Sequence, residues 1–398
     1  MMRPLSILYI AYPLLAVTGQ SAGGAEQMLL SVEREMNARG HRTTVAAADG
    51  SRVCGELLAT GPAASAPDQY EAHERMHSSR ILEYLRRNPH QFDLIHDKSG
   101  SFFRHAADCP IPVLATLHLP RPFYKQEWFR NNHSPRKHGK HGRTPVQKIP
   151  CLPCFRGEFF IISGGRNAHG DPGQALEHSL NLYFNCVSNS QACWFAELPN
   201  LLGVVQNGIA AERFPFSRDK ENYLLWLGRM CEEKGPHLAI AAAQRAGVPL
   251  VVAGQVYPFS YHQNYFEREI RPQLNGRVRF VDTPLTSQKL ELLRHARALL
   301  LTSTVEETSS LVAMEAMACG TPVVAFRRGA FPEIVADEET GLVVDTVEEM
   351  AAAFGEVNHI SPEKCRERVE QYFSAARMAQ EYEELYRRVL TSAKELAA

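Results

Sequence analysis

EETSSLVAMEAMACGTPVVAF, residues 306–326, contains the loop, helix and strand from which the fold can be predicted. Ser309 or Ser310 can cap a helix that runs to about Ala318, and the glycine and proline that follow stop that helix. The next run, PVVAF, is apolar and β-branched, as buried strands are. Because the strand-like run ALLLTS stands just before the segment, the order is strand, helix, strand. This order predicts a parallel sheet covered by helices.

The same alternation continues on both sides of this segment. In the second half of the chain the expected strands are YLLWLG, PLVVAG, VRFVD, ALLLTS and PVVAF, with helices near 236–246, 287–294 and 310–318. In the first half the expected strands are 6–11, 42–47, 94–96, 113–117 and 185–188, with a helix over about 25–39. A chain of 398 residues is too long for one small core. The two series therefore predict two doubly wound α/β domains.

The boundary between the two domains is expected in QNGIAAERFPF, residues 206–216, because its Asn-Gly pair and its proline break regular structure. The expected units are a first domain over 1–208, a second over 209–375 and a C-terminal helix over 376–398. Residues 120–180 are rich in Pro, Gly, His and Arg and have weak periodicity. An irregular insertion of this length in a compact domain is usually a functional loop or disorder.

Composition excludes several classes of protein. The formal net charge of -1 gives no overall field that would favour nucleic acid as a partner. Nine scattered cysteines fit a reducing cytoplasm better than a disulfide scaffold, so we expect a cytoplasmic protein. The apolar run after Arg3 loosely imitates a signal peptide. A glycine turn and an amphipathic helix follow it at α/β spacing, which favours a buried first strand, and no other run reaches the ~18 residues needed to span a bilayer.

Ligands of open α/β sheets bind outside the carboxyl ends of the strands, so the residues just past each strand are the first candidates. WLGRMCEEKG leaves a strand at Gly228 and sets Arg229 and Lys234 beside the start of a helix. Arginine offers a planar fork and lysine a point charge, and together with helix amides they suit a diphosphate. The alternative is a pair of solvated surface charges.

The opening segment contains two glutamates, Glu307 and Glu315, with seven residues between them. Glu307 is expected at the mouth of the cleft, beside the free N–H groups at the helix start. Glu315 lies inside a helix that is otherwise apolar and mostly buried, so its carboxylate needs hydrogen-bond donors. Sugar hydroxyls are suitable donors. The alternative is that Glu315 caps a neighbouring backbone or pairs with an arginine.

Two weaker signals stand in the first half. Gly23 and Gly24 lie between the first strand and its helix, where a backbone without side chains lets a ligand come close. The full G-x-G-x-x-G pattern and the acidic residue expected for NAD are missing, which disfavours dinucleotide binding. His118 stands just past a strand and could face the cleft, although an isolated histidine is more often a structural hydrogen bonder.

The insertion carries its own candidates. Cys151 and Cys154 form a C-x-x-C pair, and His138 and His141 stand nearby, which are residue types that bind zinc. Only one cysteine pair is present and the histidine spacing is irregular, so a reduced thiol pair is favoured over a metal site. The segment is also basic and could receive a phosphorylated acceptor or, as a peripheral membrane contact, anionic lipid headgroups. A solvated charged loop is the more common outcome.

These motifs stand in order along nearly the whole chain: GGAE, FDLIHDKSG, TLH, VSNSQ, VVQNGI, GRMCEEKG, the Glu-x(7)-Glu block with AMACGTPVVAF, and GAFPEIVADEETGLVV. As an ordered set they resemble the retaining glycosyltransferases of family four. The resemblance implies the GT-B fold, in which two Rossmann-like domains face a central cleft. It also implies that the C-terminal helix crosses back onto the first domain.

The resemblance assigns roles to the candidate residues. Gly23 and Gly24 would lie near the donor phosphates, and Arg229 and Lys234 would bind the diphosphate. Glu307 would contact the donor sugar, Glu315 the nucleotide ribose, and His118 would lie near the reacting sugar. The implied donor site also includes the helix start at Ser309, Ser310 and Leu311.

The implied reaction moves a hexose from a nucleotide diphosphate sugar to an acceptor hydroxyl, with retention, no cofactor and no metal. No D-x-D stands at an expected strand end, consistent with metal independence. The family commonly has Pro-Phe-Gly after the first glutamate, whereas this chain has Thr308-Ser309-Ser310, a departure that can shift donor preference. Two alternatives remain: a GT-B sugar-nucleotide epimerase or hydrolase, and a degenerate protein that binds sugar nucleotides without catalysis.

Overall fold

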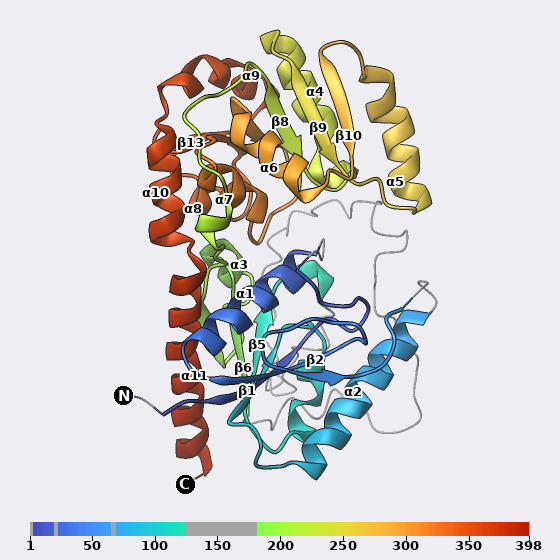
Figure 1. Cartoon of the computed structure of the whole chain (residues 1–398), viewed down its shortest axis with the longest axis vertical. Helices are drawn as coiled ribbons and strands as arrows, with labels where there is room; N and C mark the ends of the chain where they lie inside the picture. The colour runs from blue at the N-terminus through green and yellow to red at the C-terminus, as the bar shows by residue number, and fades with distance from the viewer. Residues whose placement is uncertain (1–2, 20–22, 65–68, 125–180, 398) are drawn as a thin grey trace, which may run out of the picture.

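The computed structural model describes residues 3–19, 23–64, 69–124 and 181–397. Within them the chain forms two parallel sheets, each covered by helices (Figure 1). The strand order is β3-β2-β1-β4-β5-β6-β7 in the first sheet and β10-β9-β8-β11-β12-β13 in the second. The order reverses beside β1 and beside β8, which is the mark of a doubly wound sheet. The predicted fold class is therefore confirmed.

The strands are short, as is usual for sheets buried on both faces. Those of the first sheet are β1 (Ser6–Ile10), β2 (Arg42–Ala47), β3 (Glu56–Ala59), β4 (Leu94–Asp97), β5 (Val113–Leu117), β6 (Leu182–Cys186) and β7 (Leu201–Val204). Those of the second are β8 (Leu224–Leu227), β9 (Leu250–Gly254), β10 (Val278–Asp282), β11 (Ala298–Leu301), β12 (Val323–Phe326) and β13 (Gly341–Val344).

The helices connect these strands and cover both sheets (Figure 1). In the first half they are α1 (Gly24–Ala38), α2 (Tyr70–Arg87) and α3 (Asn189–Cys193). In the second half they are α4 (Pro236–Ala246), α5 (Ser260–Tyr265), α6 (Thr286–His295), α7 (Leu311–Ala318), α8 (Phe331–Ile334), α9 (Val347–Glu356), α10 (Pro362–Tyr372) and α11 (Ala375–Ala397).

Two sequence-based expectations about strands can be judged directly. The apolar run after Arg3 is a strand, β1, which is fully buried and pairs with β2 and β4. The strand expected over 185–188 is wrong in its bounds, because β6 spans Leu182–Cys186. Ser188 cannot continue the strand since its hydroxyl accepts a hydrogen bond from the backbone N–H of Gln191 and caps α3.

The last helix, α11, lies along the first domain beside α1 (Figure 1). Its Tyr386 hydroxyl lies 3.1 Å from the hydroxyl of Tyr9 on β1 and 2.6 Å from Nδ1 of His96 on β4. The other ring nitrogen of His96 lies 2.7 Å from the hydroxyl of Thr116 on β5. Each buried polar group thus has a partner, as burial requires. The network joins the end of the chain to three central strands of the first sheet.

Acid is expected to destabilise the protein partly through His77 on α2, which is 3% exposed. Burial lowers the pKa of His77 from 6.5 to about 4. The unfolded chain therefore binds a proton before the folded chain does, and stability is lost as the pH falls from about 6.5 toward 4. Between pH 7.5 and pH 5 this histidine alone should cost about 2 kcal/mol. Urea unfolding at the two pH values measures the difference.

Two variants separate His77 from the rest of the molecule. His77→Gln removes the titrating group, so its stability should fall less than that of the wild type between pH 7.5 and pH 5. His90→Gln, in the exposed turn after the same helix, is the matched control and should keep the wild-type pH dependence. If the free energy of unfolding of His77→Gln fell as much as that of the wild type between pH 7.5 and pH 5, other groups would cause the acid sensitivity.

Candidate active site

Arg229 and Lys234 lie in the loop that joins β8 to α4, at the carboxyl end of the second sheet. The loop ends at Gly235, whose φ of 66° lies in the left-handed region. A Cβ on this glycine would stand 2.2 Å from the carbonyl oxygen of Thr302, just past β11. The hydroxyl of Thr302 also donates a hydrogen bond of 2.6 Å to the carbonyl of Gly235. The loop that carries Lys234 is thus held directly against the loop after β11.

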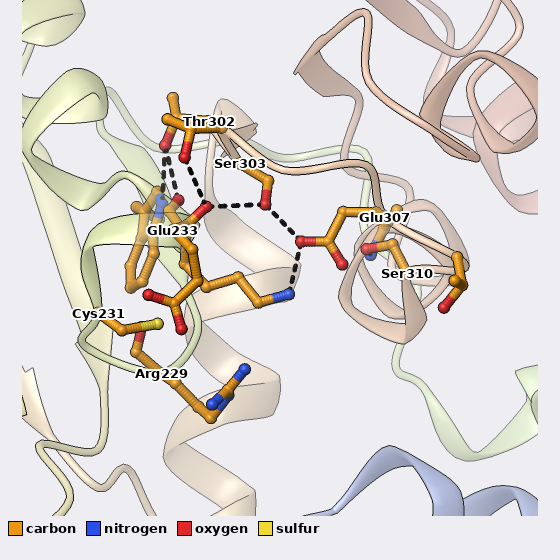
Figure 2. Close-up of polar contacts among 12 residues, drawn as sticks. Arg229, Cys231, Glu233, Thr302, Ser303, Glu307 and Ser310 are labelled. Carbon is orange, nitrogen blue, oxygen red and sulfur yellow. Dashed lines mark hydrogen bonds and ion pairs between the residues drawn. The ribbon is translucent and has the colours of Figure 1, made fainter. Parts of the chain in front are cut away.

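This contact brings Lys234 and Glu307 together. The ammonium of Lys234 lies 2.6 Å from Oε1 of Glu307, and the hydroxyl of Ser303 donates to the same oxygen (Figure 2). The two side chains of the ion pair are partly exposed, 30% for Lys234 and 13% for Glu307. Among the described residues no donor contacts the second oxygen, Oε2. One oxygen of Glu307 is therefore held by the protein, and the other can accept a hydrogen bond from a ligand.

The start of α7 stands beside this carboxylate. Ser310 caps the helix, and its hydroxyl accepts from the backbone N–H of Ala313 at 3.3 Å. Leu311 approaches the first domain, because a Cβ on Gly24 would lie 3.4 Å from its Cδ1. The glycine loop of α1 and the first turn of α7, which the sequence analysis singled out separately, therefore face each other across the domain boundary.

Gly23 is the residue before α1, and it leaves room for a carboxylate. A Cβ there would meet Oε2 of Glu26 at 1.9 Å, so the side chain of Glu26 could not keep its position over the loop. Burial raises the pKa of Glu26 above its usual range. Glu26 is a neighbour of the glycine loop that the sequence analysis did not consider, although it belongs to the quoted GGAE motif.

His118 follows β5, and its backbone carbonyl accepts a hydrogen bond of 2.7 Å from the hydroxyl of Thr308, the residue after Glu307. Its ring nitrogen Nε2 is buried and has no hydrogen-bond partner among the described residues. Burial, and then the charge of Lys98, hold the pKa of His118 well below its usual value. His118 is therefore a neutral imidazole at physiological pH, beside the loop of Glu307.

Glu315 lies in the second turn of α7 and is 4% exposed. Its carboxylate has a partner from the protein: the ammonium of Lys289 on α6 lies 2.8 Å from Oε1 and 2.6 Å from Oε2. The sequence predicts sugar hydroxyls, a neighbouring backbone or an arginine as the partner of Glu315, and the partner in the structure is a lysine instead. No local pattern marks Lys289, because the contact depends on how α6 packs against α7.

Arg229 lies at the start of the loop between β8 and α4, whereas Lys234 lies near the end of that loop. Figure 2 shows Arg229 near Cys231 and Glu233, away from Glu307. Its backbone carbonyl accepts from the N–H of Cys231 at 3.0 Å, which shapes the start of the loop. The other predicted cation, Lys234, is joined to the glutamate, so the two cations of the motif have different surroundings.

The residues considered for zinc, for which a reduced thiol pair is the favoured prediction, are Cys151, Cys154, His138 and His141, and they lie outside the described residues. Within the described ranges no group of three or more His, Cys, Asp or Glu side chains is arranged to hold a metal ion. No helix in those ranges is both long enough and apolar enough to cross a bilayer.

Comparison with known families gives two matches that divide the chain. The model described as glycosyl transferases group 1 matches residues 209–373, and the model described as glycosyltransferase family 4 matches residues 22–144. One match falls in each domain. Gly23, Gly24 and His118 lie within the first match, and the candidate donor residues of the second domain lie within the other. The chain is a member of these glycosyltransferases.

Individual proteins agree with this assignment. The D-inositol 3-phosphate glycosyltransferase of Mycobacteroides abscessus is 35% identical over 154 residues, which cover 37% of this chain and 34% of the relative. This glycosyltransferase thus spans about a third of the length of the curated relatives it matches.

Solved structures match nearly the whole chain. The sucrose-phosphate synthase of Thermosynechococcus elongatus has a TM-score of 0.70 at 19% identity and covers 98% of this chain and 100% of its own. HepE of Anabaena, solved in complex with UDP and glucose, has a TM-score of 0.66 at 16% identity. The match covers 96% of this chain and 99% of HepE. At these identities the likeness shows the GT-B fold.

Proposed function

We propose that this glycosyltransferase moves a hexose from a nucleotide diphosphate sugar to an acceptor hydroxyl, with retention at the sugar and without a metal ion. The observation that carries the proposal is the Lys234–Glu307–Ser303 network at the carboxyl end of the second sheet. The residues that follow it, Thr308 and Leu311, approach His118 and Gly24 of the first domain. The complex of HepE with UDP and glucose supports a donor of this chemical class.

The chemistry requires stabilisation of the departing diphosphate. As the bond from the anomeric carbon to phosphate breaks, negative charge grows on the diphosphate and positive charge on the sugar. Lys234 and the N-terminus of α7 would stabilise the negative charge, since both are positioned before the reaction begins, and Arg229 at the start of the same loop would add a second positive charge. The acceptor hydroxyl would attack from the same face, and the departing phosphate would take up its proton.

Glu307 has a position that suits the donor sugar. Lys234 and Ser303 fix its Oε1, so its Oε2 would accept from a sugar hydroxyl without a change of rotamer. Glu315 would accept from the ribose hydroxyls beside Lys289. The neutral imidazole of His118 would lie at the reacting sugar on the side of the first domain.

The domains would divide the substrates between them. The second domain, residues 209–375, would hold the nucleotide sugar, and the first, residues 1–208, would hold the acceptor. The insertion over about 120–180 would then contribute to acceptor specificity. The C-terminal helix expected over 376–398 would cross back onto the first domain, and the contacts of α11 with α1, Tyr9 and His96 support this division.

Binding and turnover together test the function. A panel of UDP, GDP and ADP sugars should include one that raises the melting temperature, since a ligand at 100 times its Kd stabilises by about 2.7 kcal/mol. That donor should be consumed only when a hydroxyl acceptor is supplied. Consumption without acceptor would instead support an epimerase or hydrolase, and binding without consumption a non-catalytic protein. Activity lost with EDTA and restored by a divalent ion would contradict the metal-independent mechanism.

A further inference from the structure

The loop that carries His118 is held almost entirely by its own domain. The hydroxyl of Tyr124 accepts from the backbone N–H groups of His118 and Leu119 at 3.1 and 3.3 Å. The side-chain amide of Gln191 donates to the carbonyls of Leu117 and Leu119 at 2.9 and 3.0 Å. The exception is the carbonyl of His118, whose partner is the hydroxyl of Thr308 in the second domain, at 2.7 Å.

Thr308 is buried at 9% exposure, so the hydrogen bond is formed in a water-poor contact. If the domains moved apart, both the hydroxyl and the carbonyl would need water as a new partner. Thr308 is also the residue next to Glu307, and the carbonyl it binds belongs to His118. The contact therefore holds the loop that carries Glu307 directly against the loop that carries His118.

A second contact between the domains lies at the linker. The carboxylate of Glu333 on α8 accepts from the backbone N–H groups of Asn189 and Ser190, at 2.8 and 2.7 Å, at the start of α3. It also accepts from the side chain of Gln206, next to the linker, at 3.3 Å. This contact involves the PEIV and SNSQ motifs and lies close to the Thr308 hydrogen bond. Just before α8, the N–H of Ala330 donates to the carbonyl of Glu307 at 2.7 Å, and Gln191 on α3 holds the loop of His118.

We propose that Thr308 is a positioning residue: its hydroxyl closes the cleft by binding the backbone of His118, and closure brings Glu307 and His118 to their working distance. This role explains one of the three residues that depart from the family pattern, and a separate contact explains another. A proline after the glutamate could not donate the hydrogen bond, and Ser310 is used as the cap of α7. The catalytic consequence rests on the proposed function, whereas the closure does not.

Matched substitutions of threonine test the inference. Thr308→Val removes the hydroxyl at nearly constant shape, and Thr308→Ser keeps it. The control is Thr304→Val in the same loop, where the hydroxyl lies 3.4 Å from the carbonyl of Glu233 in its own domain. Small-angle X-ray scattering of the full chain without ligand reports closure, and kinetics with the donor found in the panel report catalysis.

Thr308→Val should lower the ratio of closed to open molecules about tenfold, so that a closed-to-open ratio of about 10:1 would become about 1:1. Its radius of gyration should exceed that of the wild type, and kcat/KM should fall about tenfold with kcat carrying most of the loss. Thr308→Ser and Thr304→Val should match the wild type in radius of gyration and in kcat/KM. A wild-type radius in Thr308→Val, or equal losses in Thr308→Val and Thr308→Ser, would overturn the inference. Since scattering needs no turnover, failure of the proposed reaction leaves that part of the test intact.

Discussion

Glu307→Ala is expected to lower kcat/KM for donor turnover by about 10²–10³-fold, the usual cost of removing one fixed electrostatic contact from a transition state. The carboxylate fixes the ammonium of Lys234 and, in the proposed mechanism, accepts from the donor sugar. Its loss should therefore leave Lys234 free to move and the sugar without its anchor. Steady-state kinetics with the donor identified by the panel measure the effect.

Lys234→Ala should cause a loss of similar size, because the departing diphosphate would lose a positive charge. The two residues are in direct contact, so their effects should not add. The double variant should be close to the worse single variant. If the two losses multiplied, the side chains would act independently, and the shared network would not explain the site.

A control is needed for damage to the fold. The side chains of Lys234 and Glu307 are partly exposed, so alanine at either position should leave the free energy of unfolding in urea within about 1 kcal/mol of the wild type. Arg271→Ala breaks an ion pair with Glu267 on the exposed side of the same domain and should keep full activity. Wild-type turnover in Glu307→Ala or Lys234→Ala would reject the proposed site.

The parallel sheets could be predicted because most of their inner strands are continuous apolar runs. β9, β11 and β12 are examples, and each has neighbours on both sides. Three strands were not predicted: β3, β7 and β13. All three are short and lie at the edge of a sheet. Such strands are stabilised by pairing with a distant neighbour, which no local pattern records.

The candidate residues were predicted from their place after strands, and their partners were not. β8 and β11 are adjacent in the second sheet, which is why Lys234 and Glu307 meet. Lys289 and Thr308 find partners on other elements, and Thr308 and His118 are 190 residues apart in sequence. Contacts of this kind depend on packing between elements and between domains, so the sequence indicates which residues reach the cleft without indicating what holds them there.

Gly235→Ala is expected to have a large effect although it changes no charge. Alanine in the left-handed region costs about 1–2 kcal/mol. Here the new Cβ would also stand 2.2 Å from the carbonyl oxygen of Thr302, and the obstacle is backbone rather than a flexible side chain. Crowding of this kind adds about 1–3 kcal/mol. The loop of Lys234 must then move away from the loop of Ser303 and Glu307, so stability and turnover should both fall.

Gly247→Ala supplies the matched comparison, because Gly247 caps the other end of α4 with nearly the same φ, 67° against 66°. A Cβ there would have its closest neighbour, Nη1 of Arg277, at 3.9 Å. This variant should lose about 1–2 kcal/mol and keep its kcat. Urea unfolding and donor kinetics on both variants separate the effect of backbone strain at the glycine from the effect of moving the Lys234 loop. Equal kcat in the two alanine variants would mean that the network at Glu307 tolerates movement of the Lys234 loop, and the fixed geometry proposed for catalysis would have to be abandoned.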